Sequence, residues 1–571
     1  MRRRKKRNMF PAIIIIVLIF IFAGVFALQQ YLKRYSYSQE KADLDEYFGI
    51  NGAEDVPIIL GTERIEEHAL LLDGYYYMDF KSVQKYLNDR FYFGEYDGTL
   101  LYTTPTAIIT SEIGSKSWSD TEGGASEEPY VISRLEGEDL YVALEYVKKY
   151  TNFAYEGFTE PNHMLLTTKW EEQSVAEVKK KTQIRLRGGV KSEILKELEK
   201  GDSVQVLEEL ENWSKVMSDD GYIGYVENKR LSDVTTISPI PVNDYTEPEY
   251  TNLLRDHKIN LGFHNLGGPA GNDSLVESIS GTKSLNVVAP TWFAVTSNEG
   301  AVRSYASAAY VNTAHSKGIE VWALIDNFTG GSEVSTSEFI NRASSRAAII
   351  ENVVRETTAV GADGINLDFE SVNSEDGQSF VQFVRELSIA CRKAGLVFSI
   401  DNYVPMNFND FYDLEEQGVV ADYVIIMGYD EHYPGSAEAG SVASIGYVEN
   451  GIINALKEVD ASKVINAVPF YTRIWHNNNG QLNVETVGMK KAQEYIVNHN
   501  INMQWDAATG QNYGSYASDD GIVHQIWMED ASSLGQKIEV MSANNIAGIA
   551  EWCLGMETSD VWDVIAAYIG G

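Results

Sequence analysis

The run "GADGINLDFESV" (Gly361 to Val372) combines the pattern of a buried strand with carboxylate side chains. Its apolar residues recur at every second position, at Ile365, Leu367 and Phe369. Because successive side chains of a strand point to opposite faces, Asn366, Asp368 and Glu370 share the other face. Aspartate and glutamate are rarely buried unless they are paired or functional. The run therefore predicts a strand with one face in a hydrophobic core and the other in a polar site.

The chain from about His257 onward repeats this strand pattern, with amphipathic helical patterns between the strands. Eight apolar runs occur, namely "INLGF", "LNVVAPTWFAV", "IEVWALIDNF", "GINLDFE", "LVFSIDNYV", "YVIIMGYD", "VINAVPFY" and "IAGIAEW". Such runs are typical of a parallel sheet that is buried on both faces. They predict an α/β fold, a (β/α)8 TIM barrel over residues 256–571, with an inserted subdomain from about His476 to Met528.

The polar face of the opening run is expected to lie at the carboxyl-terminal mouth of this barrel, where barrel enzymes keep their chemistry. Asp368 and Glu370 would stand about 7 Å apart along the strand. Their repulsion in a partly dry pocket raises at least one pKa and keeps a proton available near neutral pH. Cleavage of a glycosidic bond requires a carboxylic acid of this kind.

Two other interpretations of the carboxylates stay open at this point. One is a buried network that only fixes the strand register. The other is a metal site formed by Asp363, Asp368 and Glu370, although the motif contains no histidine and magnesium or calcium sites usually draw their oxygens from a loop. We expect neither a metal ion nor a cofactor.

The run "DGINLDFE" (Asp363 to Glu370) resembles the Asp-Gly-x-Asp-x-Asp-x-Glu signature of glycoside hydrolase family 18, the chitinase-like barrels. Three later runs resemble the motifs on strands six, seven and eight of that family, namely "MGYD" (Met427 to Asp430), "VPFYTRIW" (Val468 to Trp475) and "EW" (Glu551, Trp552). The arrangement is similar to the branch found in bacterial spore-cortex and cell-wall glucosaminidases. It departs from the family at Asn366, where aspartate is usual. We expect the Asn366 amide to hydrogen-bond the Asp368 carboxyl, and the pH dependence to change without loss of activity.

The resemblance implies a substrate-assisted retaining mechanism and assigns the catalytic roles. Glu370 would protonate the leaving oxygen and later act as the base for water. Asp368 would orient the 2-acetamido N–H of the sugar, and Tyr429 would hydrogen-bond its carbonyl. Asp363 and Asn366 would support these residues.

The resemblance also implies a set of substrate-binding residues. Trp552 would form the apolar floor under the sugar ring, although a tryptophan that only fills the core is the alternative. The others are Met427, Asp430, Tyr471 and Arg473, of which Arg473 could instead form a structural ion pair.

The N-terminal region predicts a membrane anchor. The uncharged run "MFPAIIIIVLIFIFAGVFAL" (residues 9–28) is long enough to cross a bilayer as a helix. The basic cluster "RRRKKR" before it predicts a cytoplasmic tail over residues 1–8, because basic segments that flank a membrane helix stay on the cytoplasmic side. We expect a single-pass protein of a Gram-positive cell membrane whose main body is extracellular, with a stalk over residues 29–55. A cleaved signal peptide is the alternative.

An internal repeat follows the stalk. "YMDFKSVQKY" (Tyr77 to Tyr86) recurs 64 positions later as "YVALEYVKKY" (Tyr141 to Tyr150). Each copy predicts a short helix followed by two strands, so residues 56–175 are expected to form a duplicated α+β module. It resembles the N-terminal domain of copper amine oxidases. The module is a spacer or a wall contact in this interpretation.

Short alternating strands with glycine turns then predict a small β-barrel over residues 176–235. Trp213 and "GYIGYV" (Gly221 to Val226) make it resemble a bacterial Src-homology-3-like domain, which either binds wall material or is purely structural. A proline-containing linker over residues 236–255 leads to the TIM barrel.

Charge and cysteine content narrow the possible partners. The net charge is −36, and without the basic tail the body carries about −42. This charge argues against nucleic acid and against anionic membrane or wall polymers as electrostatic partners of the body, and it favours a neutral substrate. The two cysteines, Cys391 and Cys553, have no pattern of a disulfide framework, and Cys391 fits a helical core position.

These observations predict a membrane-anchored extracellular glycosidase. It would hydrolyse β-1,4 linkages next to N-acetylglucosamine in peptidoglycan or chitin. An inactive carbohydrate-binding barrel of the envelope is the alternative, although such lectin-like relatives commonly lack the residue at position 370. A scaffold for envelope assembly is a third possibility.

Overall fold

The computed structural model describes residues 10–241 and 245–570. The predicted cytoplasmic tail, residues 1–8, and Met9 of the predicted anchor lie outside the described residues. The chain forms two compact units. One contains residues up to 89, 114–116 and 128–247, and the other contains 90–113, 117–127 and 248 to the end.

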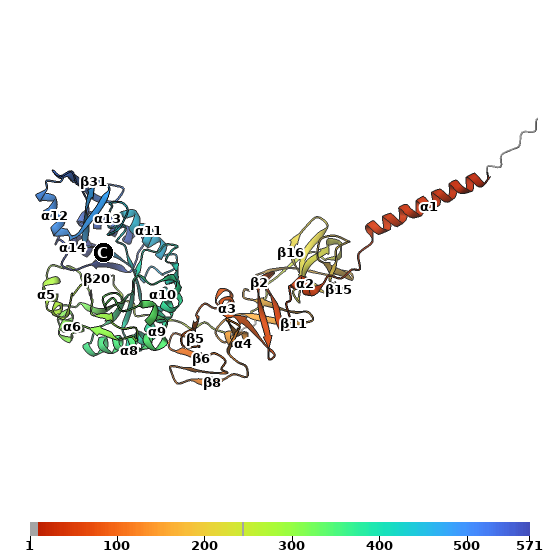
Figure 1. Cartoon of the computed structure of the whole chain (residues 1–571), viewed down its shortest axis with the longest axis horizontal. Helices are drawn as coiled ribbons and strands as arrows, with labels where there is room; N and C mark the ends of the chain where they lie inside the picture. The colour runs from red at the N-terminus through yellow and green to blue at the C-terminus, as the bar shows by residue number, and fades with distance from the viewer. Residues whose placement is uncertain (1–9, 242–244, 571) are drawn as a thin grey trace, which may run out of the picture. The chain divides into compact units, whose positions relative to one another are not determined.

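The second unit is built on a closed eight-stranded parallel barrel (Figure 1). Its strands are β20 (Ile259–His264), β21 (Val287–Pro290), β24 (Glu320–Asp326), β25 (Gly364–Asp368), β26 (Val397–Tyr403), β27 (Tyr423–Met427), β28 (Val464–Pro469) and β34 (Gly548–Trp552). β21 pairs with β24, and β20 pairs with both β21 and β34, which closes the ring. The eight predicted strand runs and the predicted TIM barrel are confirmed.

Helices cover the outside of this barrel (Figure 1). The longer ones are α6 (Ala308–His315), α8 (Ala343–Val360), α9 (Gly377–Ala394), α10 (Leu414–Val420), α11 (Ile445–Ala455), α13 (Ala531–Ala543) and α14 (Val561–Ile569). α8 ends at Gly361, which adopts a left-handed φ of 77° that glycine tolerates without steric cost. This turn leads the chain directly into β25 and the carboxylate run.

Two apolar layers show which way the strand side chains point. Leu324, Val397 and Ala550 belong to a cluster that fills the barrel interior. Ile365 and Leu367 belong to the other cluster, with helix residues such as Phe380 of α9. Because side chains alternate along a strand, the neighbours of Ile365 and Leu367 must face the barrel axis. One face of β25 therefore packs against the helices and the other faces the barrel interior, as predicted.

The connection between β28 and β34 contains a separate antiparallel sheet of five strands in the order β30-β29-β33-β32-β31. Its elements are β29 (Tyr471–Asn478), β30 (Gln481–Gly488), α12 (Met489–Asn498), β31 (Gln504–Asp506), β32 (Gln511–Ala517) and β33 (Val523–Met528). β29 begins two residues after β28 ends, so Tyr471 and Arg473 stand near the barrel mouth.

A second antiparallel sheet in this unit comes from early in the chain. It consists of β4 (Phe91–Gly94), β5 (Thr99–Thr103), β6 (Ile108–Glu112), β7 (Ser117–Asp120) and β8 (Ala125–Glu127). The hydroxyls of Tyr92 and of Ser379 in α9 hydrogen-bond at 2.9 Å in a buried contact. Arg90 pairs with Glu416 of α10 at 3.1 Å. The compact unit of the barrel therefore includes a sheet from within the predicted 56–175 module.

The first unit contains the rest of that module. β3 (Tyr75–Asp79) and β10 (Asp139–Ala143) pair antiparallel, with Met78 opposite Val142. Each strand runs into a short helix, α3 (Phe80–Tyr86) or α4 (Leu144–Val147). The two copies of the repeat thus lie side by side in one sheet, whose other strands are β1 (Asp55–Leu60), β2 (Glu63–Leu72), β9 (Ser133–Glu136), β11 (Ala154–Thr159) and β12 (Asn162–Thr167).

A further seven-stranded sheet of the first unit has the order β15-β14-β18-β17-β16-β13-β19. Its strands are β13 (Gln173–Glu177), β14 (Thr182–Arg185), β15 (Ile194–Leu198), β16 (Ser203–Glu209), β17 (Trp213–Ser218), β18 (Ile223–Glu227) and β19 (Thr235–Ile237). It encloses its own apolar cluster, which includes Ile184, Val204 and Val216. This sheet lies where the sequence predicts a small β-barrel, over residues 176–235.

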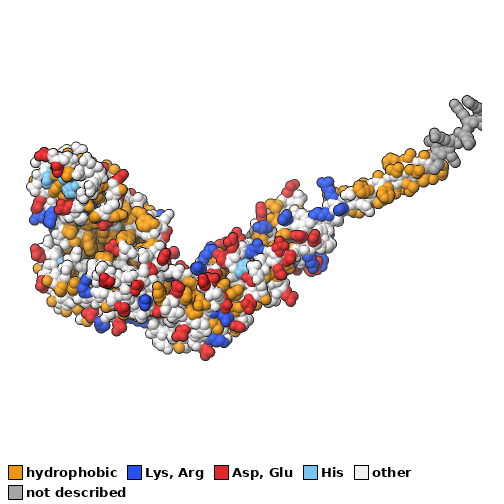
Figure 2. Space-filling model, viewed as in Figure 1, with side chains coloured by type: hydrophobic (Ala, Val, Ile, Leu, Met, Phe, Trp, Pro, Cys, Tyr) orange, Lys and Arg blue, Asp and Glu red, His pale blue; other side chains and the backbone are white. Residues whose placement is uncertain are grey.

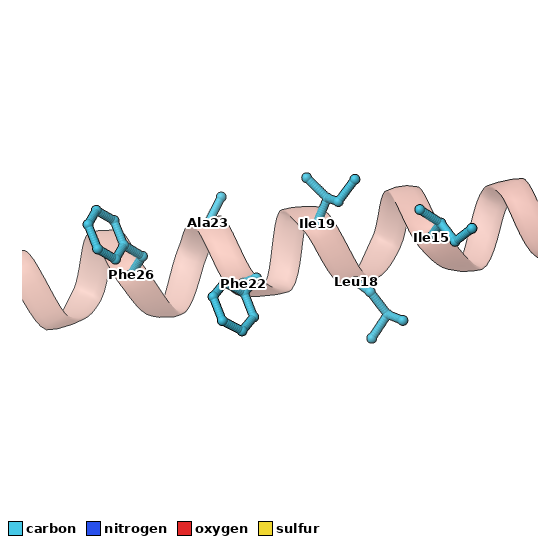
Figure 3. A pocket seen from close by; sticks show the side chains of 6 residues that line it. All are labelled: Ile15, Leu18, Ile19, Phe22, Ala23 and Phe26. Atoms are coloured by element: carbon cyan, nitrogen blue, oxygen red, sulfur yellow. The ribbon is translucent and has the colours of Figure 1, made fainter.

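An apolar helix, α1 (Phe10–Tyr35), precedes these sheets. Residues 12–35 are long and apolar enough to cross a membrane. Figure 2 shows apolar side chains along the helix. A shallow hollow on its surface is lined by Ile15, Leu18, Ile19, Phe22, Ala23 and Phe26 (Figure 3). All six residues belong to α1, and none is polar.

Both cysteines are buried and free. Cys391 lies in the apolar layer between the barrel and its helices, as predicted for a core position.

Candidate active site

Glu370 lies two residues beyond the end of β25, at the mouth of the barrel. The Tyr403 hydroxyl donates a hydrogen bond to its Oε2 at 2.7 Å. Its backbone is held on both sides by Asn327, whose amide accepts from the Glu370 N–H at 2.9 Å and donates to the Glu370 carbonyl at 2.8 Å. Burial raises the pKa of Glu370, the Tyr403 hydrogen bond lowers it, and the charges of Asp430 and Asp326 raise it. The net rise favours a protonated carboxyl.

Asp368 is the last residue of β25 and is only 4% exposed. Its Oδ1 has no hydrogen-bond partner among the described residues. Burial raises its pKa well above the ordinary value, and the charges of Asp401, Glu370 and Asp326 raise it further. Its backbone is in register with Asp326 of β24. Asp368 is therefore a dry carboxyl within a group of acids, and one of its oxygens is buried without a hydrogen-bond partner among the described residues.

The amide of Asn366 does not bond Asp368, which corrects our expectation. Its Nδ2 donates to Ser399 Oγ at 3.0 Å and to Asp401 Oδ1 at 3.1 Å. Residues two apart on one strand are about 7 Å apart, whereas neighbouring strands are about 4.8 Å apart. The amide therefore reaches across to β26 and not along its own strand.

Tyr429 stands two residues beyond β27, beside these acids. Burial raises its pKa well above the ordinary value, and so do the charges of Tyr471, Asp401, Asp368 and Glu370. Its ring meets that of Tyr471 edge to face, with centroids 6.2 Å apart. The phenol is thus within electrostatic reach of both predicted catalytic acids.

The remaining predicted residues of this side form one cluster on Asp430. The Tyr471 hydroxyl donates to Asp430 Oδ1, and the Arg473 guanidinium lies 2.9 Å from the same oxygen. Arg473 also donates to the carbonyl of His432 at 2.8 Å. Asp430 itself has a left-handed φ of 62°, which is uncommon outside glycine. The structure thus holds Arg473 in an ion pair, the alternative role that we considered for it. Met427 ends β27 and is buried.

A pocket of ≈ 360 Å³ opens next to Asp368. Trp552 and Asp326 line it, together with Arg303 and Tyr305 from the segment before α6. Trp552 packs against Phe263, with ring centroids 5.4 Å apart. An aromatic plane beside dry carboxylates suits a sugar ring, whose CH groups stack on the aromatic face while its hydroxyls meet acceptors.

Asp363 lies away from this site. It precedes β25 and accepts hydrogen bonds from the backbone N–H of Val321 and from His315, both at 2.8 Å. Five residues of strand separate it from Asp368, or about 16 Å. A metal ion could not bind Asp363 and Asp368 together, so that alternative is wrong. Asp363 fixes the start of β24 against β25 instead.

Three site residues were missed from the sequence, namely Asp326, Asp401 and Tyr403. Each lies within an apolar strand run, an even number of positions from a residue whose side chain faces the barrel interior. The alternation that singled out Asp368 would have found them if it had been applied to "IEVWALIDNF" and "LVFSIDNYV".

This fold and this site define a class of protein: a TIM barrel with a carboxylic acid of raised pKa, a second dry carboxyl and an aromatic plane at its mouth is a glycoside hydrolase. Comparison with known families gives the assignment. The pattern of glycosyl hydrolases family 18 matches residues 255–557, more than half of the chain. The chain belongs to this family. The pattern of the bacterial SH3 domain matches residues 181–232. The resemblance of residues 56–175 to the N-terminal domain of copper amine oxidases stays a prediction.

Similar proteins include enzymes of Bacillus species. A putative sporulation-specific glycosylase of Bacillus subtilis is 27% identical over 257 residues, which are 43% of this chain and 60% of that protein. The cortical fragment-lytic enzyme of Bacillus anthracis is 23% identical over 237 residues, 40% of this chain and 55% of that enzyme. These matches thus span little more than half of each relative. The crystal structure of the Bacillus cereus spore cortex-lytic enzyme shares the fold, with a TM-score of 0.50 and 22% identity over 58% of this chain and 78% of that one.

Proposed function

We propose that this chain is a membrane-anchored, extracellular glycosidase that hydrolyses β-1,4 linkages next to N-acetylglucosamine in peptidoglycan. The observation that carries this proposal is the placement of Glu370, an acid of raised pKa, near Asp368 and Tyr429 at the mouth of a family 18 barrel. The family assignment supports a glycosidase. Its substrate, mechanism and location are our inference.

Glu370 donates its proton to the glycosidic oxygen as the bond from that oxygen to the anomeric carbon breaks. The oxygen of the sugar's own 2-acetamido group attacks the anomeric carbon and forms a cyclic oxazolinium intermediate. Glu370, now a carboxylate, then takes a proton from the water that opens this intermediate. Two displacements at one carbon retain the anomeric configuration.

Asp368 and Tyr429 hold the acetamido group for this attack. The Asp368 carboxylate, which lines the pocket, accepts the acetamido N–H, and its negative charge offsets the positive charge of the oxazolinium. The Tyr429 hydroxyl donates to the acetamido oxygen. Preorganised groups of this kind are worth about 2.7–4 kcal/mol each. Trp552 supports the ring from below, Asp430 and Tyr471 meet the hydroxyls of a neighbouring sugar, and Arg473 holds Asp430 through its ion pair.

Two observations favour peptidoglycan over chitin. Relatives are named for the lysis of cortical fragments and of the spore cortex, and we infer that the polymer is peptidoglycan. The pocket also contains a cation, Arg303, whose Nε is buried without a partner in the described part of the chain. Chitin offers only neutral groups, whereas the lactyl arm of muramic acid offers carboxyl or carbonyl oxygens. Guanidinium groups bind such oxygens strongly.

Helix α1 supports the proposed location. It is long enough to span a bilayer and its apolar side chains are exposed. We place residues 9–28 in the cell membrane of a Gram-positive bacterium, with the modules of residues 56–175 and 176–235 as a spacer or wall contact. Removal of α1 as a signal peptide would leave the enzyme secreted.

The test is the full chain in mild detergent, given purified peptidoglycan or chito-oligosaccharides. We expect new reducing ends on N-acetylglucosamine from peptidoglycan, identified by the mass of the products, and initial products of retained anomeric configuration by NMR. Cleavage of chito-oligosaccharides alone would move the substrate to chitin. Binding of both polymers with cleavage of neither across pH 4 to 8 would show a carbohydrate-binding protein and overturn the proposal.

A further inference from the structure

Three aspartates lie side by side on three adjacent barrel strands. Asp326 of β24 is in register with Asp368 of β25. The pairing of Leu367 with Ile400 places Asp368 next to Asp401 of β26. All three are at most 4% exposed. Asp401 is not part of the signature run and comes from a different strand.

The three carboxyls have different partners. Asp326 accepts hydrogen bonds from the backbone of Phe328 and from the backbone and hydroxyl of Thr329. Asp401 accepts one hydrogen bond, from the amide of Asn366. Asp368 has a free oxygen. Adjacent buried carboxyls cannot all ionise, because their like charges repel in a dry site. The proton is therefore held by Asp368 or Asp401.

We propose that Asp401 is the positioning residue for Asp368: it takes the place of the acid that position 366 lacks, and it holds the proton that leaves Asp368 ionised. This inference rests on the proposed function, because it assigns Asp368 a charged role toward the acetamido group. In this chain the supporting acid is therefore Asp401 on β26, and not a residue at position 366 on β25. The Asn366 amide hydrogen-bonds the Asp401 carboxyl.

The surroundings of Asp401 agree with a neutral carboxyl. Burial raises its pKa to about 8, the hydrogen bond from Asn366 lowers it, and the charge of Glu370 raises it. The titratable groups that interact electrostatically with it are Asp368 and Glu370 at the end of β25 and Tyr429 beyond β27. None of these groups is a cation that would hold Asp401 ionised at neutral pH.

The first arm of the test is stability, which needs no activity. The raised pKa of Asp401 stabilises the folded chain at low pH, and this contribution is lost as the pH rises toward 8. D401N has no carboxyl at this position, so it does not lose stability in this way as the pH rises. We expect its melting temperature, relative to wild type, to be higher at pH 8 than at pH 5. The exposed D410N, nine residues further on, serves as the control and should show no such trend. An equal offset of D401N at both pH values would overturn the proposal.

The second arm is the pH profile of kcat/KM on peptidoglycan with the full chain. Asp368 must be ionised to act, so its pKa sets the acidic limb. D401N removes the group that holds the proton, so the proton passes to Asp368, and we expect the limb to move to higher pH by about one unit, with plateau activity within about tenfold of wild type. N366D adds a second carboxyl that can hold the proton and should move the limb to lower pH. The double variant N366D/D401N should return it toward the wild-type position.

The outcomes separate the two proposals. An inactive wild type, or an E370Q variant as active as wild type, would contradict the proposed function. An active wild type whose acidic limb is unmoved by D401N would contradict the role of Asp401, even if D401N lowers the rate. A merely structural Asp401 would change activity or melting temperature without moving the limb.

Discussion

The Tyr403 hydroxyl donates a hydrogen bond of 2.7 Å to Oε2 of Glu370, the proposed general acid. This bond favours the ionised form and partly offsets the rise in pKa that burial causes. Tyr403 thus sets how strong an acid Glu370 is. The two residues come from neighbouring strands that the barrel places side by side.

Y403F should raise the pKa of Glu370, because the bond that favours its carboxylate is lost. The protonated form is active, and activity disappears as the pH rises through this pKa. The alkaline limb of kcat/KM should therefore move to higher pH, with a fall in rate of about tenfold or less from the loss of one hydrogen bond. A limb that stays in place or moves to lower pH would contradict this link.

Glu551 should make the fold less stable as the pH rises. It is fully buried, and neither carboxyl oxygen has a partner within the described residues. Burial, and then the charge of Glu557, raises its pKa well above the ordinary value. The folded chain favours the neutral form of Glu551, so the fold is more stable at low pH. This stability is lost as the pH rises and the buried carboxyl ionises. E551Q should gain melting temperature over wild type at pH 8 more than at pH 5. A gain that does not depend on pH would contradict a titrating Glu551.

The sheet β4–β8 should contribute to the stability of the barrel. Glu416 of α10 is buried between Arg90 at 3.1 Å and Arg385 at 2.7 Å. R90M removes one of these cations, and the other remains. We expect a loss of about 1–3 kcal/mol in the free energy of unfolding, measured by thermal denaturation of the full chain. R355M, which changes an exposed arginine of α8, is the matched control and should cost less than about 0.5 kcal/mol.

Arg303 should decide the preference for a muramoyl substrate. R303M keeps the length of the stem but removes the cation from the pocket that Asp368 and Trp552 line. Cleavage of peptidoglycan should fall by at least about tenfold, the loss of one charge-assisted hydrogen bond, and cleavage of chito-oligosaccharides should change little. An equal fall on both substrates would show that Arg303 supports the pocket structurally through its bonds to Thr329.

The barrel could be predicted from the sequence because eight buried parallel strands each leave a local apolar signal. Asp368 and Glu370 could be predicted because a charge inside such a run is rare. The bond from Asn366 to Asp401 could not, since it depends on which residues of β25 and β26 are opposite each other. The contact of the sheet β4–β8 with the barrel could not be predicted either. Its strands are visible locally, but its attachment to α9 and α10 is a tertiary contact without a periodic pattern.

The most direct measurement compares three full-length chains on purified peptidoglycan: wild type, E370Q and E375Q. Glu375 is an exposed carboxylate five residues from Glu370, so it controls for the loss of a charge. Wild type and E375Q should release reducing ends at equal rates, whereas E370Q should fall by at least about a hundredfold with an unchanged melting temperature. An E370Q chain that is folded and cleaves at the wild-type rate would contradict the central claim that Glu370 is the proton donor.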